Sequence, residues 1–316
     1  MNLQTKIKLK KVSQNQISYS SKVLLLGSCF SENIGNKFNY FKFRANQNPF
    51  GILFHTKAIE NLITNAIHKK EYKEEDLVFQ NERWHCFDAH SSFSSVDKNA
   101  ILERLNSRIL STKKQLEEAN HIIITLGTSW VYRFEETATI VANCHKIPQK
   151  KFLKKLLSVD EIGHSLEMIT SGIRSINKNV TIIFTVSPVR HLKDGFVENK
   201  LSKSHLITAI HQLLKNQNVS YFPSYEIMMD ELRDYRFYAE DMIHPNNIAI
   251  NYIWEQFIMT WFSEKTISIM KEIEIIQKGI SHKPFHENSE QHQFFLKNLE
   301  EKIIKIKQEI PFLNFN

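Results

Sequence analysis

Three apolar runs punctuate the first two thirds of the chain, and each is nearly continuous instead of alternating with polar residues. They cover residues 23–26, 122–126 and 180–186, and a weaker run covers residues 219–222. A strand that is apolar on both faces is typical of a parallel sheet with helices on both sides. We therefore predict four strands of such a sheet.

Between these runs, apolar residues recur at the spacing of an α-helix. The predicted helices cover residues 56–68, 102–118, 159–177 and 203–214. Strands that alternate with helices of this length predict a doubly wound α/β sheet. In such a sheet, ligands bind beyond the carboxyl ends of the strands. The turns expected at those ends are Gly27-Ser28, Gly127-Thr128-Ser129 and Ser187-Pro188.

Two segments depart from this alternation. Residues 79–95 have an extended pattern, which predicts a hairpin or a lip over the site. From residue 264 onward the chain lacks a strand pattern, and two apolar stripes at helical spacing flank residues 279–284. We predict an α/β domain over residues 1–263 and a helical hairpin over residues 264–316. The hairpin is expected to pack on the α/β domain or on a partner chain, which leaves a homo-oligomer open.

Charge and composition narrow the class of protein. The 316 residues are 42% hydrophobic and carry a formal net charge of +7. The basic residues are spread along the chain, so we expect no nucleic-acid binding. The first residues are polar, and no apolar run approaches the roughly 20 residues that span a bilayer. We therefore expect a cytoplasmic protein without membrane contact, whose three cysteines are reduced thiols.

The turn Gly27-Ser28-Cys29 is the first candidate for chemistry, because it joins a predicted strand to a helix expected to begin near Ser31. The free N–H groups and the dipole at a helix N-terminus stabilise negative charge. A thiol in that place has a lowered pKa, whereas a hydroxyl needs a neighbouring base. The plainer interpretation is a simple turn in which Cys29 is a small buried hydrophobe.

Asp241 and His244, followed by Pro245, form the second candidate. A carboxylate can orient an imidazole and stabilise its cation, and the imidazole can then take a proton from a nucleophile. Taken alone, the pair is equally compatible with a cap or a salt bridge. Together with the Gly27-Ser28-Cys29 turn, it predicts a hydrolase-type site.

The motif Gly27-Ser28-Cys29-Phe30-Ser31 resembles the name-giving motif of the GSCFA family, a group related to the SGNH (GDSL-like) hydrolases. Further stretches resemble that family, and together they span about residues 22–260 before the likeness continues into the tail. They are Asn48-Pro49-Phe50-Gly51, Leu126-Gly127-Thr128-Ser129-Trp130, Ser187-Pro188-Val189-Arg190-His191 and residues 231–238. Several long motifs in the same order make a chance match improbable.

The resemblance implies a flavodoxin-like sheet and ester or acyl chemistry. It implies that Asp241 is the catalytic carboxylate and His244 the base, and that the Gly51 N–H contributes to the oxyanion hole. The superfamily's third block reads Gly-x-Asn-Asp, but this chain has Gly127-Thr128-Ser129-Trp130, so the amide donor is missing. Thr128 or Ser129 would have to replace it, and losing one such donor costs about a hundredfold in rate.

The resemblance leaves the nucleophile open between two neighbours. Matching Gly-Asp-Ser residue by residue places Cys29 at the serine position, whereas a slide of one residue makes Ser28 the nucleophile. The geometry of the turn favours its third residue, Cys29.

Other polar residues are expected to line the substrate pocket: Asn48, Asp88, His90, Arg190 and His191. The cluster of His85, Cys86, Asp88 and His90 matches no common spacing of metal ligands, so we expect no metal. The sequence thus predicts an SGNH-like hydrolase or acyltransferase that acts on an O-acyl ester, such as that of a carbohydrate, without a cofactor. The alternative is a non-catalytic binding or scaffolding protein on a decayed hydrolase fold, which the missing amide favours.

Overall fold

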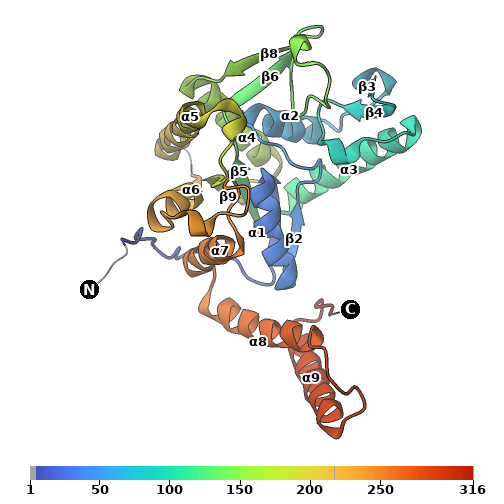
Figure 1. The fold of residues 1–316 in the computed structure, drawn as a ribbon, viewed down its shortest axis with the longest axis vertical. Coiled ribbons are helices and arrows are strands. Elements are labelled where there is room, and N and C mark those ends of the chain that lie inside the picture. Colours follow the sequence, from blue (N-terminus) through green and yellow to red (C-terminus); the bar gives the residue numbers. More distant parts are fainter. Residues whose placement is uncertain (1–4, 217, 316) are drawn as a thin grey trace.

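A five-stranded parallel sheet forms the centre of the protein (Figure 1). The computed structural model describes residues 5–216 and 218–315, so the outermost ends of both predicted domains lie outside the described residues. The strand order is β10-β9-β5-β1-β2. The strands are β1 (Lys22–Gly27), β2 (Arg44–Gln47), β5 (His121–Leu126), β9 (Thr181–Val186) and β10 (Ser220–Phe222). This is the flavodoxin-like order, which confirms the predicted fold class.

The register of the sheet brings the strand ends together. Leu26 pairs with Ile124 across β1 and β5, and Leu126 pairs with Val186 across β5 and β9. Because all the pairings are parallel, the turns after β1, β5 and β9 share one rim, as predicted. Strand β2 was not predicted because, at the sheet edge, none of its four residues is fully buried and the sequence has no apolar run there.

Helices cover both faces of the sheet. One face is covered by α2 (Thr56–Ile67), α3 (Lys98–Glu118), α4 (Val159–Ile176) and α5 (Phe196–Asn216). The opposite face is covered by α1 (Cys29–Tyr40) and α7 (Asn247–Trp261). Successive strand residues alternate between the faces. Leu24 and Leu26 belong to the first cluster, whereas Val23 and Leu25 belong to the second.

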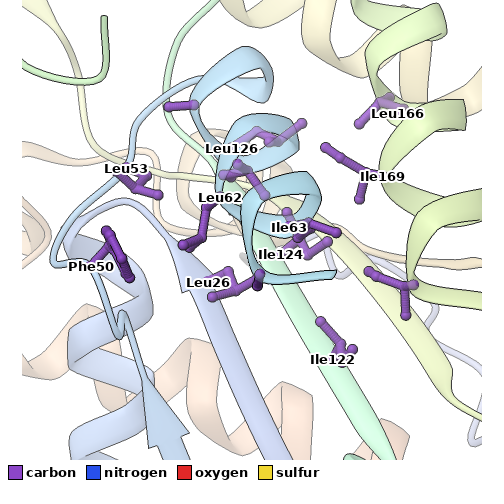
Figure 2. Packing of buried hydrophobic residues seen from close by; sticks show 14 of the residues in the cluster. Leu26, Phe50, Leu53, Leu62, Ile63, Ile122, Ile124, Leu126, Leu166 and Ile169 are labelled. Atoms are coloured by element: carbon purple, nitrogen blue, oxygen red, sulfur yellow. The ribbon is translucent and has the colours of Figure 1, made fainter. Parts of the chain in front are cut away.

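The core under α2 and α4 shows what holds these layers together (Figure 2). Ile122 and Ile124 of β5 lie beneath Leu62 and Ile63 of α2, with Ile169 of α4 beside them. Burying one such aliphatic side chain contributes about 1.5–3 kcal/mol. Helix α5 begins seven residues before its prediction, because its first turns expose apolar residues that break the periodic pattern.

Smaller elements surround the sheet. A hairpin of β3 (Leu77–Gln80) and β4 (Arg83–Cys86) overlaps the segment predicted as extended. A separate antiparallel sheet in the order β7-β6-β8, which was not predicted, comprises β6 (Trp130–Phe134), β7 (Thr139–Val141) and β8 (Phe152–Leu156). Short helical turns complete this part: η1 (Glu74–Asp76), η2 (Ser91–Phe93), η3 (Gln149–Lys151), η4 (Leu192–Asp194), α6 (Ser224–Glu226), η5 (Ile227–Glu231) and η6 (Tyr235–Phe237).

The tail forms the predicted helical hairpin, with α8 (Glu264–Ile280) and α9 (Glu290–Glu309). Figure 1 shows it extending from the end of α7, away from the sheet. Ile273 of α8 is fully buried in the same cluster as α1 and α7, and Gln277 donates a hydrogen bond to the Tyr40 carbonyl at 2.8 Å. In the described part of the chain, no helix is long and apolar enough to cross a membrane.

Candidate active site

The turn between β1 and α1 requires a glycine. Gly27 has a φ of +134°, and a Cβ there would lie 2.1 Å from the Thr125 carbonyl oxygen of β5. A side chain at this position is therefore excluded by both the backbone conformation and the neighbouring strand. The Ser28 N–H donates to the same Thr125 oxygen at 3.1 Å, which fixes the turn against the sheet.

Ser28 and Cys29 have different environments. Ser28 is fully buried and is the N-cap of α1, where its Oγ accepts the Phe30 N–H at 3.3 Å. Cys29 is the first residue of the helix, and its partly exposed side chain lines a cleft. Burial raises the pKa of the Cys29 thiol and Glu32 raises it further, whereas Lys203 and the N–H groups of Cys29 and Phe30 lower it.

Asp241 holds His244 by several bonds. His244 donates its Nδ1–H to Asp241 Oδ2 at 2.6 Å. Asp241 Oδ1 accepts the backbone N–H groups of Ile243 at 2.9 Å and His244 at 3.0 Å. These bonds, chiefly the one from the His244 backbone, lower the pKa of Asp241 to about 2. The carboxylate thus fixes the tautomer in which His244 Nε2 can accept a proton.

One cleft of about 490 Å³ contains both Cys29 and His244. Helix α1 contributes Cys29, Glu32, Asn33 and Asn36, and the opposite wall consists of Ala239, His244, Pro245, Asn246, Asn247 and Ile250. His244 Nε2 has no hydrogen-bond partner within residues 5–216 and 218–315. A hydrogen bond from Ser28 or Cys29 to His244 is therefore a prediction that this structure does not show. The parallel sheet brings the two segments to one cleft.

The residues expected at the oxyanion hole have partners inside the protein. The Gly51 N–H donates to the Asn48 carbonyl at 2.8 Å, and a Cβ on Gly51 would lie 2.4 Å from His90 Cβ. The N–H groups of Gly127 and Thr128 both donate to the Phe54 carbonyl, at 2.7 and 3.1 Å. These groups tie the loop after β2 to the end of β5.

The Thr128 and Ser129 side chains bond to α5 instead of facing the cleft. Thr128 Oγ1 lies 3.0 Å from Ser202 Oγ, and Ser129 Oγ donates to the Ser202 carbonyl at 2.5 Å. Ser129 is also fully buried. Their hydroxyl groups therefore anchor α5 at the rim of the sheet.

Asn48 is a buried side chain with a spare donor next to the Gly27-Ser28-Cys29 turn. Its Oδ1 accepts the Gly27 N–H at 2.9 Å, and its own N–H donates to the Leu25 carbonyl at 2.9 Å. Its Nδ2 is buried and has no hydrogen-bond partner among the described residues. A buried donor without a partner costs about 1–3 kcal/mol, so this amide is a candidate for contact with a ligand.

Asp88 and His90 lie in different places, although only Ala89 separates them in the sequence. Asp88 accepts hydrogen bonds from Asn61 at 2.8 Å and from Lys70 at 3.3 Å, and it lines a separate hollow. His90 packs beneath Gly51, and burial lowers its pKa, which Glu32 of the cleft opposes. His90 is therefore electrostatically coupled to the cleft, whereas Asp88 belongs to another polar cluster.

Arg190 supports the loop that carries Asp241 and His244, and His191 is the next residue along the chain. The Arg190 N–H donates to the Ile243 carbonyl at 3.2 Å, and its guanidinium lies 4.3 Å from the Tyr238 ring centroid. His191 Nε2 is buried and unpartnered in the described part of the chain. Burial, with smaller contributions from Lys203 and His244, lowers the pKa of His191 to about 3, so its ring is neutral.

Sequence analysis missed Lys203, the buried lysine of α5. Its Nζ donates to the carbonyls of Gly127 and Ser187, at 2.7 Å each. Burial lowers its pKa to about 7. A sequence signal does exist, because Lys203 is three residues before Leu206 and seven before Ile210, on the stripe that α5 buries. No group of three or more potential metal ligands occurs among the described residues.

Two family models match this chain. The model of the GSCFA family matches residues 22–257, and that of the GSCFA domain protein C-terminal domain matches residues 273–316. No curated protein matches the sequence.

Two solved structures are similar to this chain. A carbohydrate esterase family 3 protein from Talaromyces cellulolyticus has 12% identity and a TM-score of 0.37, over 80% of this chain and 99% of that one. An acetyl xylan esterase from the rumen bacterium Butyrivibrio proteoclasticus has 10% identity and a TM-score of 0.41, over 77% of this chain and 63% of that one.

Proposed function

This chain belongs to the GSCFA family, and we propose that it is an ester hydrolase or acyltransferase whose nucleophile is Cys29. The observation that carries the proposal is the cleft shared by Cys29, at the start of α1, and His244, held by Asp241. Ser28 is the weaker candidate because its Oγ is buried and caps the helix.

The proposed reaction has two steps. His244 Nε2 takes the proton of Cys29 Sγ, and the sulfur attacks the acyl carbon to form a thioester. The alcohol leaves with the proton that His244 held. Water or a second alcohol then attacks the thioester, gives its proton to His244 and restores the thiol. Asp241 stabilises the imidazolium that forms in each step.

The oxyanion requires N–H donors that do not already donate hydrogen bonds to other groups of the protein. The N–H of Cys29 lies at the positive end of α1, where negative charge is stabilised. The unpartnered Nδ2 of Asn48, bonded through its Oδ1 to Gly27, supports a role as the second donor. Asn48 would thereby replace the amide that the Gly127-Thr128-Ser129 segment lacks.

An O-acyl ester of a hydroxyl-rich molecule, such as a carbohydrate, is the proposed substrate. Asn33, Asn36 and Asn247 line the same cleft as Cys29. Side-chain amides both donate and accept hydrogen bonds, as hydroxyl groups require. Glu32 adds an acceptor at the same wall.

The test is hydrolysis of p-nitrophenyl acetate and of acetylated sugars by the purified protein. Cys29→Ala and His244→Ala are expected to lose at least about a thousandfold in kcat. Ser28→Ala is the matched control, because it removes the neighbouring hydroxyl and should keep most of the activity.

Two results would contradict the proposal. Equal activity in Cys29→Ala and the wild type would exclude the thiol, and loss only in Ser28→Ala would make the serine the nucleophile. Absence of turnover on the entire panel, combined with tight binding of an acetylated sugar, would favour the non-catalytic binding protein instead.

A further inference from the structure

Lys203 is a buried amine whose charged form has no buried anion as a partner among the described residues. Its side chain is among the largest fully buried ones, and its two hydrogen bonds go to neutral carbonyl oxygens of Gly127 and Ser187. Within the described residues, no carboxylate forms an ion pair with it. A buried charge is costly unless an opposite charge compensates it, so this lysine favours any negative charge that forms nearby.

The ammonium group lies at the rim where α1 begins. Gly127 and Ser187 follow β5 and β9, and the Ser187 N–H donates to the Leu126 carbonyl at 2.8 Å. Strand β5 also pairs with β1, and its Thr125 carbonyl accepts the Ser28 N–H. Only the carboxyl end of β5 therefore lies between Lys203 and the Gly27-Ser28-Cys29 turn that follows β1.

Lys203 has unused donor capacity. An ammonium group carries three N–H donors, and the two carbonyls account for two of them. The Tyr225 ring centroid lies 5.7 Å from Lys203 Nζ. The other groups that face this region are Glu32 of α1, whose charge opposes ionisation of Cys29, and the imidazoles of His191 and His244. The charge of Lys203 acts to lower the pKa of Cys29, and the charge of Cys29 acts to raise the pKa of Lys203.

We propose that Lys203 is a positioning residue that ties the ends of β5 and β9 together and stabilises negative charge on Cys29 when the thiol loses its proton. The inference rests on the proposed function, in which Cys29 is the nucleophile. A lysine that only ties the two strand ends would affect stability and leave the ionisation of Cys29 unchanged. The ionisation of the thiol is therefore the decisive readout.

The first experiment measures alkylation of Cys29 by iodoacetamide, followed by peptide mass spectrometry, in wild type, Lys203→Met and Lys200→Met. Lys200 is the matched control because it is on the same helix and donates to the Tyr225 hydroxyl at 3.1 Å. Lys203→Met should slow alkylation at pH 7 about tenfold, which corresponds to one pKa unit. Lys200→Met should match the wild type, and Cys144 should react equally in all three proteins.

The second experiment needs no substitution, in case Lys203→Met does not fold. The wild-type thiol is alkylated with iodoacetate, which adds a carboxylate at Cys29, or with iodoacetamide, which adds a neutral amide. NMR of protein labelled at the lysine Cε should give Lys203 a higher pKa in the carboxylate adduct, because the coupling is reciprocal. Equal pKa values in the two adducts, or unchanged alkylation in folded Lys203→Met, would overturn the inference. Neither experiment uses a substrate, so the outcome is separate from that of the esterase assays.

Discussion

Ser28 and Cys29 show how adjacent side chains take different roles at a helix start. The N-cap side chain must turn back to the backbone, so Ser28 Oγ accepts the Phe30 N–H and is withdrawn from solvent. The next residue points outward, and Cys29 lines the cleft. The order Ser before Cys therefore places a small polar N-cap inside the turn and the thiol in the cleft.

Asp241→Asn is expected to reduce kcat by roughly three to four orders of magnitude, because the amide no longer favours the tautomer of His244 that accepts a proton. Kinetics on an activated ester, with circular dichroism to confirm the fold, would measure this. Asp234→Asn is the matched control: Asp234 also caps a nearby turn, through the Arg236 N–H, but it does not line the cleft. Similar losses in both variants would show that the effect is structural.

Lys203 should make stability depend on pH. Its pKa falls from 10.5 to about 7 on folding, so between pH 7 and 8.5 the unfolded chain binds more protons than the folded one. The free energy of unfolding should then rise with pH, by about 1 kcal/mol per unit. Urea titrations at several pH values would measure the slope, and Lys203→Met should reduce it. An equal slope in both proteins would contradict the shift.

The turn from β1 into α1 is the most constrained element of the site. Gly27→Ala should destabilise the protein by about 3 kcal/mol or more, since the new Cβ meets the Thr125 carbonyl and the backbone has a positive φ. Gly163→Ala is the matched control, because a Cβ there meets nothing within 4 Å and a helical alanine is more stable by about 1 kcal/mol. Urea unfolding of the two variants should give opposite signs.

Three of the four predicted strands were those in which burial on both faces decides the pattern. Strands β1, β5 and β9 are buried on both faces, so their apolar runs are continuous. Strand β2 and the sheet β7-β6-β8 are exposed on one side or at an edge, and their short alternations resemble loops. Whether such segments form strands depends on neighbours that are distant in the sequence, so their local sequence gives little indication of it.

The same contrast applies to the site. Motif resemblance identified Cys29 and His244, which share one cleft. It did not identify Lys203, because a lysine in a helix is ordinarily solvated and its burial depends on the carbonyls of two distant loops. Asp88 was expected at the pocket mouth, but its hydrogen bonds to Asn61 and Lys70 place it in another cluster.

The helical hairpin of α8 and α9 is joined to the rest of the protein by packing as well as by the chain. Ile273→Ala on α8 should destabilise the protein by about 2–5 kcal/mol, because its side chain is fully buried with α1 and α7. Ile275→Ala, two residues further along the same helix and 53% exposed, should change stability by less than about 0.5 kcal/mol. Thermal unfolding would measure both.

Removal of residues 264–316 should cause aggregation or a lower Tm, because the partners of the hairpin would be exposed. A truncated protein with unchanged stability would mean that the hairpin is dispensable.

The distance along the chain between the two walls of the cleft has a consequence for synthesis on the ribosome. Cys29 emerges early, but His244 and Ile250 of the opposite wall emerge more than two hundred residues later. Under the proposed function, the nascent polypeptide until then carries the Cys29 thiol without the His244 base, so it should be unable to form a thioester with an acyl substrate. The proposed chemistry therefore requires the chain to be synthesised as far as residues 239–250, which form the wall opposite α1.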